Sequence, residues 1–177
     1  MQLTHWMAGG AVILCSVASW WDLRTRRIPN ALTIPALVAA LCIHSVLGAG
    51  QGLFLSLSGA LVAGALVLPG YALRSTGGGD VKLLMAVGAI LTYPLALKAG
   101  LAALIAGGLI GLADSIRTGR LRDTLRRTAS LGRWMFGRAA GAPLARPESS
   151  GRHIPFGVAI AVATLAIALV PGIGGSR

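Results

Sequence analysis

Acidic side chains are scarce in this sequence: Asp and Glu number five among 177 residues, against sixteen Lys and Arg. Charged residues of both signs make up only 12%, about half their share in soluble domains. Apolar residues account for 55%, and glycines add a further 25 residues. The composition therefore disfavours a soluble globule, excludes intrinsic disorder and predicts a polytopic membrane protein with basic loops.

Cysteines and ligand-binding motifs are also few. The two cysteines, Cys15 and Cys42, lie inside apolar runs, so a disulfide scaffold is excluded. The sequence has neither a CxxC motif nor a Cys/His cluster, and it has no GxxxxGK[ST] phosphate loop. We therefore expect no metal site and no cofactor. The basic charge balance does not indicate nucleic-acid binding, because no soluble domain is left to do it.

Uncharged stretches long enough to cross a membrane recur along the chain. Residues 3–21 form an uncharged run that would reach about 28 Å as a helix, close to the hydrocarbon thickness of a bilayer. The uncharged stretch 28–73 is too long for one span, but its glycine-rich segment 48–52 provides a turn. The next run is interrupted at Tyr93-Pro94 and closed by Lys98. We therefore expect an all-helical protein with six spans, at residues 3–21, 32–48, 53–73, 81–97, 99–116 and 154–172.

The positive charges divide unequally between alternate loops. Fourteen of the sixteen Lys and Arg lie in or beside the loops 22–31, 74–82 and 117–153. Cytoplasmic loops carry such an excess, so the three loops are predicted to face the cytoplasm and both chain termini the outside. We interpret residues 1–177 as a single membrane-embedded domain. The arginines of 117–153 are expected to bind anionic lipid, with 119–138 as a surface helix.

Small residues recur at helical spacing in two of the expected spans. Ala and Gly occupy every fourth position from Ala99 to Gly111, and the third span has similar pairs at Gly59 with Ala63 and at Ala60 with Gly64. Small side chains allow helix backbones to approach closely in a membrane. The pattern predicts tight helix packing and needs no functional explanation.

Two of the five acidic residues are not explained by ion pairing within the basic loops. Asp22 and Asp80 each lie where an expected span meets a cytoplasmic loop, whereas the other three acids lie in or beside the loop 117–153. A single carboxylate at a helix end is usually a cap or a solvated charge. Two of them on one membrane face favour a functional site, because carboxylates at the membrane are costly. Paired carboxylates share a proton, which is what aspartyl proteolysis requires.

Glycines precede one of these aspartates. Gly77, Gly78 and Gly79 lack side chains, so their backbone can lie extended against a substrate, although a plain inter-helix loop has the same composition. Lys82 follows Asp80 closely and either tunes that carboxylate or reaches to the membrane interface. Asn30 is expected to cap the second helix.

Three segments carry a resemblance to a known family. The segments 22–30 (DLRTRRIPN), 77–83 (GGGDVKL) and 154–157 (IPFG) resemble the three signatures of the type IV prepilin peptidases, membrane aspartyl proteases of the GxGD class. They occur in the family order. The short length is similar to that of the branch that serves the Flp, or tight-adherence, pilus.

The resemblance implies an enzyme of the cell membrane that removes the basic leader of type IV prepilins and pseudopilins at the cytoplasmic face. It implies that Asp22 and Asp80 are the catalytic pair. Substrate contacts would come from Gly77, Gly78, Gly79, Lys82, Pro155, Phe156 and Gly157. The cysteine-containing N-terminal insert of the long members is absent, so we expect no methyltransferase activity. The sequence leaves the oligomeric state open.

Two other classes of function use the same residues differently. A small proton-coupled transporter would employ the carboxylates as protonation sites, but it would place them near mid-membrane rather than at the cytoplasmic ends. A non-catalytic scaffold of a secretion machine would retain its function without either aspartate.

Overall fold

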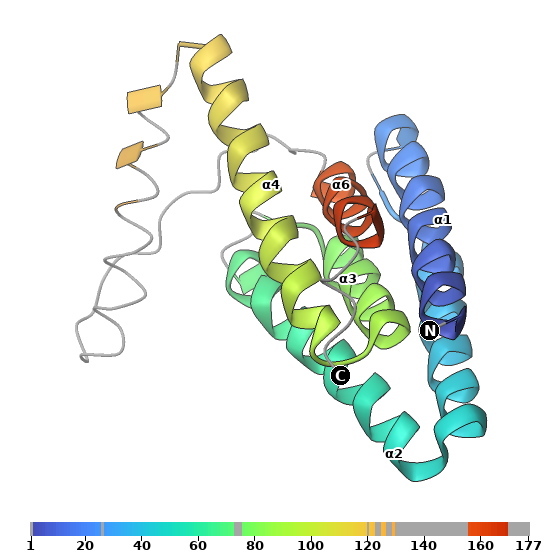
Figure 1. The fold of residues 1–177 in the computed structure, drawn as a ribbon. Helices are drawn as coiled ribbons and strands as arrows, with labels where there is room; N and C mark the ends of the chain where they lie inside the picture. Colours follow the sequence, from blue (N-terminus) through green and yellow to red (C-terminus); the bar gives the residue numbers. More distant parts are fainter. Residues whose placement is uncertain are drawn as a thin grey trace.

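The computed structural model describes residues 2–25, 27–72, 76–119, 121–122, 125–126, 129 and 156–169. The described residues form five helices, which confirms the all-helical fold class (Figure 1). Three helices, α1, α2 and α4, are long and apolar enough to cross a membrane. The six spans and the orientation of the termini stay predictions. The helices are α1 (Gln2–Thr25), α2 (Asn30–Ala72), α3 (Gly78–Leu91), α4 (Leu95–Arg117) and α6 (Phe156–Leu169).

Helix α2 is a bent helix that folds back on itself. Its 43 residues would extend about 65 Å if straight, roughly twice the hydrocarbon thickness of a bilayer. The backbone leaves helical geometry at Ala49 (φ 47°, ψ −139°), and two arms diverge from this bend in Figure 1. The bend falls inside the predicted turn at 48–52 but is narrower than predicted. Helical structure resumes directly after Ala49 and continues to Ala72.

The turn between α3 and α4 lies earlier in the chain than expected. Helix α3 ends at Leu91 and α4 begins at Leu95, so the boundary lies at Tyr93-Pro94. The prediction that one helix continues to about residue 97 and closes at Lys98 is wrong, because Lys98 lies in the first turn of α4. Proline disfavours helical geometry at the preceding residue, and at Tyr93-Pro94 this effect outweighs the position of the charge.

Helix α3 lies at the centre of the bundle and contacts each of the other four described helices. Its side chains Leu83, Leu84 and Val87 are fully buried. At Gly88 the α3 backbone lies directly against the α2 backbone at Gly59, so neither position has room for a side chain. The predicted small-residue face of the second α2 arm is therefore confirmed as a helix contact.

Side chains from both α2 arms cap the C-terminal end of α3. The last carbonyl groups of a helix lack partners within it. Ser56 donates a hydrogen bond of 2.8 Å to the Ala89 carbonyl, and His44 Nε2 lies 3.2 Å from the Ile90 carbonyl.

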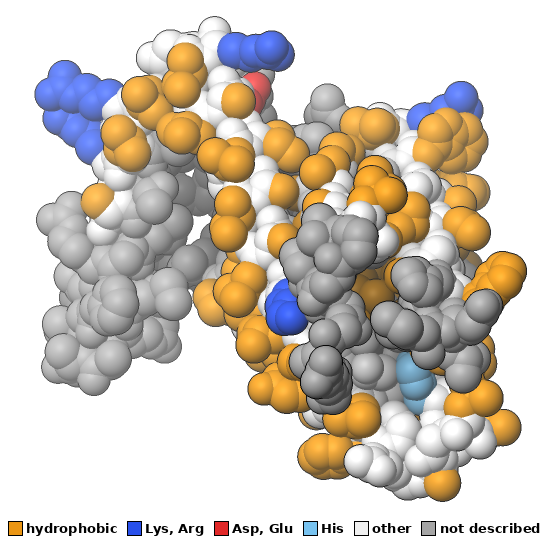
Figure 2. All heavy atoms as spheres, viewed as in Figure 1, with side chains coloured by type: hydrophobic (Ala, Val, Ile, Leu, Met, Phe, Trp, Pro, Cys, Tyr) orange, Lys and Arg blue, Asp and Glu red, His pale blue; other side chains and the backbone are white. Residues whose placement is uncertain are grey.

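Helix α4 packs through the small residues that the sequence singled out. Ala99, Ala103 and Gly107 are buried, and α4 contacts α6, α3 and α2. The outward faces of the helices are apolar. Exposed side chains include Trp6, Val46, Phe54, Ile105 and Leu169. Figure 2 shows hydrophobic side chains spread along the helices, as expected for a protein that lipid surrounds.

Candidate active site

Asp22 lies in the last turn of α1, on the buried face of that helix. Helix α1 ends at Thr25, so it continues past the expected end of the first span at residue 21. Ala11, Cys15, Ala18 and Asp22 follow one another at helical spacing, and all four are buried. The Asp22 side chain is only 3% exposed although Trp21 and Leu23 beside it face outward. Burial of a carboxylate at this point is the feature that packing alone does not explain.

Asp80 lies in the first turn of α3 and is 4% exposed. Its Oδ2 atom accepts a hydrogen bond of 3.1 Å from the Gly77 backbone N–H. The carboxylate thus occupies the favourable end of the helix dipole and satisfies one of the amides at the helix start. This capping role and a catalytic role are compatible, because a carboxylate has two oxygens.

The three glycines before Asp80 are not uniformly extended. Gly77 is extended (φ −75°, ψ 150°), but Gly78 and Gly79 belong to α3, so the expected extended run is limited to its first residue. Gly79 serves close packing instead. A methyl group there would lie 3.0 Å from the Ile28 Cβ atom and 3.4 Å from the Ile28 carbonyl oxygen. The glycine therefore lets the start of α3 approach the segment that joins α1 to α2.

Ile28 and Gly157 connect the surroundings of the two aspartates. A methyl group at Gly157 would lie 3.3 Å from the Asp22 Oδ2 atom and 3.7 Å from the Ile28 Cδ1 atom. Ile28 in turn lies against Gly79, the residue before Asp80. The end of α1, the start of α3 and the start of α6 therefore meet around one buried isoleucine. Residues 58 positions apart in the sequence are brought into one neighbourhood by these contacts.

Lys82 and Asn30 form a second link between α3 and α2. Lys82 Nζ donates a hydrogen bond of 2.9 Å to Asn30 Oδ1. Asn30 is the first residue of α2, and its side-chain oxygen accepts this hydrogen bond from the ammonium group. The expected capping role stays a prediction. Lys82 is exposed, so its ammonium remains accessible at the edge of the site.

Ser19, which the sequence did not single out, links α1 to α6 beside Asp22. Its hydroxyl lies 2.7 Å from the Cys15 carbonyl and 2.9 Å from the Gly157 carbonyl. The sequence predicts that Ser19 and Asp22 share one face of a helix, because they are three residues apart. It does not predict the contact with Gly157 of α6, because 138 positions separate the two residues.

The last signature lies only partly within the described residues. Gly157 is buried in the first turn of α6, which begins at Phe156. Pro155 and most of the loop 117–153 lie outside the described residues, and the predicted surface helix 119–138 lies largely outside them too. Arg122 and Arg126 are described and exposed.

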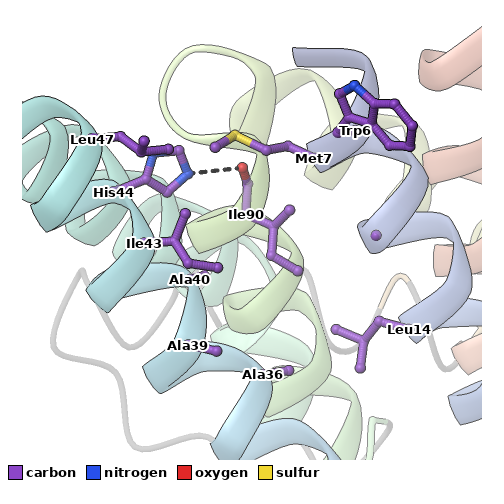
Figure 3. A pocket seen from close by; sticks show the side chains of 11 residues that line it. Trp6, Met7, Leu14, Ala36, Ala39, Ala40, Ile43, His44, Leu47 and Ile90 are labelled. Carbon is purple, nitrogen blue, oxygen red and sulfur yellow. Dashed lines mark hydrogen bonds between the residues drawn. The ribbon is translucent and has the colours of Figure 1, made fainter. Parts of the chain in front are cut away.

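An apolar cavity of about 410 Å³ lies between α1, the first arm of α2 and α3. Figure 3 shows Leu14 of α1 and Ile43 of α2 among its lining side chains, with the His44–Ile90 hydrogen bond beside it. Neither aspartate lines this cavity. The two candidate carboxylates therefore lie outside this cavity.

Comparison with known proteins identifies the family of the chain. The profile of the type IV leader peptidase family matches residues 10–112, which is more than half of the chain. The chain therefore belongs to the type IV leader peptidase family, a family of peptidases. The match contains Asp22, Asp80, the three glycines and Lys82, but it ends before Gly157. Neither the search of curated proteins nor the search of solved structures found a match.

Proposed function

We propose that this leader peptidase is an aspartyl endopeptidase in which Asp22 and Asp80 act together on one water molecule. The observation that supports the proposal is the packing around Ile28, which lies against Gly79, the residue before Asp80, and beside Gly157, which lies against Asp22. Both aspartates are buried. Burial weakens the solvation of a carboxylate, and two neighbouring carboxylates do not both ionise readily. One proton shared by the pair supplies a base and an acid at the same time.

In the proposed reaction, the ionised carboxylate takes a proton from the water, whose oxygen attacks the peptide carbonyl carbon. The protonated carboxyl group donates a hydrogen bond to the carbonyl oxygen as negative charge develops there. The C–N bond then breaks, and the amine leaves with the proton that the base received. The products are a carboxylic acid and an amine, and the two aspartates return to their shared-proton state.

The proposed substrate is the basic leader of type IV prepilins of the Flp class or of pseudopilins. The reaction would take place at the cytoplasmic face of the cell membrane, where the positive-inside rule puts the loops 22–31 and 74–82. Gly77 supports the binding of an extended peptide substrate, because its backbone at the start of α3 is extended and can pair with a strand. The remaining proposed contacts are Gly78, Gly79, Lys82, Pro155, Phe156 and Gly157, with anionic lipid bound by the arginines of 117–153. We propose no methyltransferase activity.

Co-expression with a candidate prepilin tests the proposal. The wild-type protein is expected to remove the leader, whereas Asp22→Asn and Asp80→Asn are each expected to lower the cleaved fraction at least a hundredfold, because each removes the base or the acid. Asp114→Asn is the matched control, since Asp114 lies on α4, in its last turn. It should cleave normally.

Full cleavage by Asp22→Asn or by Asp80→Asn contradicts the proposal. Assembly of the pilus by the double variant, with the leader still attached to the pilin, would instead favour a scaffold function.

A further inference from the structure

The Ser19 hydroxyl bridges two helices at the level of the candidate site. It is buried, at 8% exposure, and it reaches the Cys15 carbonyl of its own helix and the Gly157 carbonyl of α6. A hydroxyl has one hydrogen, so the two carbonyls share it in a bifurcated hydrogen bond. The contact to Gly157 is the only one of the two that joins different helices.

Gly157 of α6 also lies against the Asp22 carboxylate. A methyl group added at Gly157 would lie 3.3 Å from Asp22 Oδ2. Ser19 and Asp22 are three residues apart and therefore lie on neighbouring positions of one helix face. The two side chains contact the same residue of α6 from adjacent turns of α1. Any shift of the first turn of α6 along α1 would therefore change the surroundings of Asp22.

A second polar contact holds the same two helices deeper in the bundle. Cys15 Sγ lies 3.6 Å from Thr164 Oγ1, and the Thr164 hydroxyl donates its hydrogen to the Ile160 carbonyl at 2.7 Å. Either the thiol or the hydroxyl can be the donor of the contact between the helices. Together with the buried residues Ala163 and Ile167, this contact pairs α1 with α6 independently of Ser19.

We propose that Ser19 is a positioning residue of the peptidase, which fixes the start of α6 so that Gly157 shields the Asp22 carboxylate. The inference rests on the proposed function of Asp22 and deepens it. Ser19 itself does not touch the reacting atoms. Since the Cys15–Thr164 contact remains, loss of the Ser19 hydroxyl is expected to release only the first turn of α6 and to leave the fold intact.

Ser16 provides a matched control on the same helix. Its hydroxyl donates a hydrogen bond of 2.8 Å to the Val12 carbonyl, four residues earlier, as the Ser19 hydroxyl does to Cys15. Ser16 is exposed. Ser16→Ala and Ser19→Ala each remove a hydrogen bond to the carbonyl four residues earlier in α1. Only Ser19→Ala also removes a contact to α6.

The first experiment measures leader removal by the purified full-length variants. Ser19→Ala is expected to lower kcat about tenfold, because release of the first turn of α6 changes the surroundings of the Asp22 carboxylate. Ser19→Thr, which keeps the hydroxyl, should recover most of the rate, and Ser16→Ala should equal the wild type. The melting temperature of all variants should stay within a few degrees.

A second measurement does not depend on activity. A carbodiimide with a hydrophilic amine labels accessible carboxylates, and mass spectrometry of the peptides reports the label at Asp22. Ser19→Ala is expected to increase that label severalfold relative to Asp114, whereas Ser16→Ala leaves it unchanged. Unchanged labelling in Ser19→Ala overturns the proposal, as does a fall in kcat that Ser19→Thr does not reverse. If wild-type protein leaves the prepilin intact, the proposed function fails, and the labelling still decides the role of Ser19.

Discussion

At the residue scale, the space beside the Asp22 carboxylate depends on a missing side chain at Gly157. A Cβ atom there would lie within 3.3 Å of Oδ2, which is closer than most real Cβ contacts. The φ angle of Gly157 does not lie in the left-handed region, so the requirement for glycine comes from this space and not from the backbone angle. Gly79 is likewise required for lack of space, because a side chain there would meet Ile28.

Gly157→Ala is expected to lower kcat about tenfold, equivalent to about 1.4 kcal/mol in the barrier, because the new methyl group displaces the carboxylate. Gly108→Ala is the control, since a methyl group at Gly108 would meet no atom within 4 Å. The two variants are compared by steady-state kinetics of leader removal. Equal activity of both would show that the Gly157 contact does not constrain the site.

The residues of the candidate site differ in how far the sequence reveals them. Asp22 and Asp80 stand out because acids are scarce and both lie at the ends of apolar runs. Ser19 does not stand out, because a helical serine ordinarily bonds the carbonyl four residues earlier, as Ser16 does here. Only the fold shows that one of these two hydroxyls also reaches α6.

At the element scale, the helix boundaries follow local backbone chemistry more closely than charge. The break at Tyr93-Pro94 was predictable because proline has no N–H to donate and constrains the residue before it. Lys98 does not end the helix that the sequence predicts to about residue 97, because it lies in the first turn of α4. The bend at Ala49 was predictable in place but not in width, because glycines on either side of it are tolerated within the helix.

The pairing of α1 with α6 leads to a cross-linking prediction. Thr164→Cys in a Cys42→Ser background is expected to form a disulfide with Cys15 upon oxidation, because the two side chains are already in contact. Leu165→Cys is the control, since its side chain is exposed. The cross-link is detected as a peptide pair by mass spectrometry after digestion. Equal cross-linking of both variants would contradict the packing of these helices.

At the scale of the whole molecule, the charge asymmetry and the bent α2 helix lead to a topology prediction. A membrane-impermeant thiol reagent applied to intact cells is expected to label Gly50→Cys, beside the bend of α2, but not Arg27→Cys, in the loop between α1 and α2. Both variants carry Cys42→Ser, and permeabilised cells should label both. Labelling of Arg27→Cys alone from outside would reverse the orientation.

The fold class and the membrane character of the molecule followed from composition, because an apolar chain with few charges needs lipid as its solvent. Composition does not predict which helices pack against one another. Helix packing depends on backbone approaches such as that of Gly59 to Gly88, and many small-residue patterns in the sequence would permit such contacts.

The most direct test of a single two-aspartate centre is the rate of leader removal by purified Asp22→Asn, Asp80→Asn and double variants. If the two aspartates act as one unit, removal of either one abolishes the contribution of both. The double variant should therefore be no slower than either single variant. The N-terminal mass of the pilin reports the cleavage. A double variant whose loss equals the product of two partial losses would show that the aspartates act independently and would contradict the shared site.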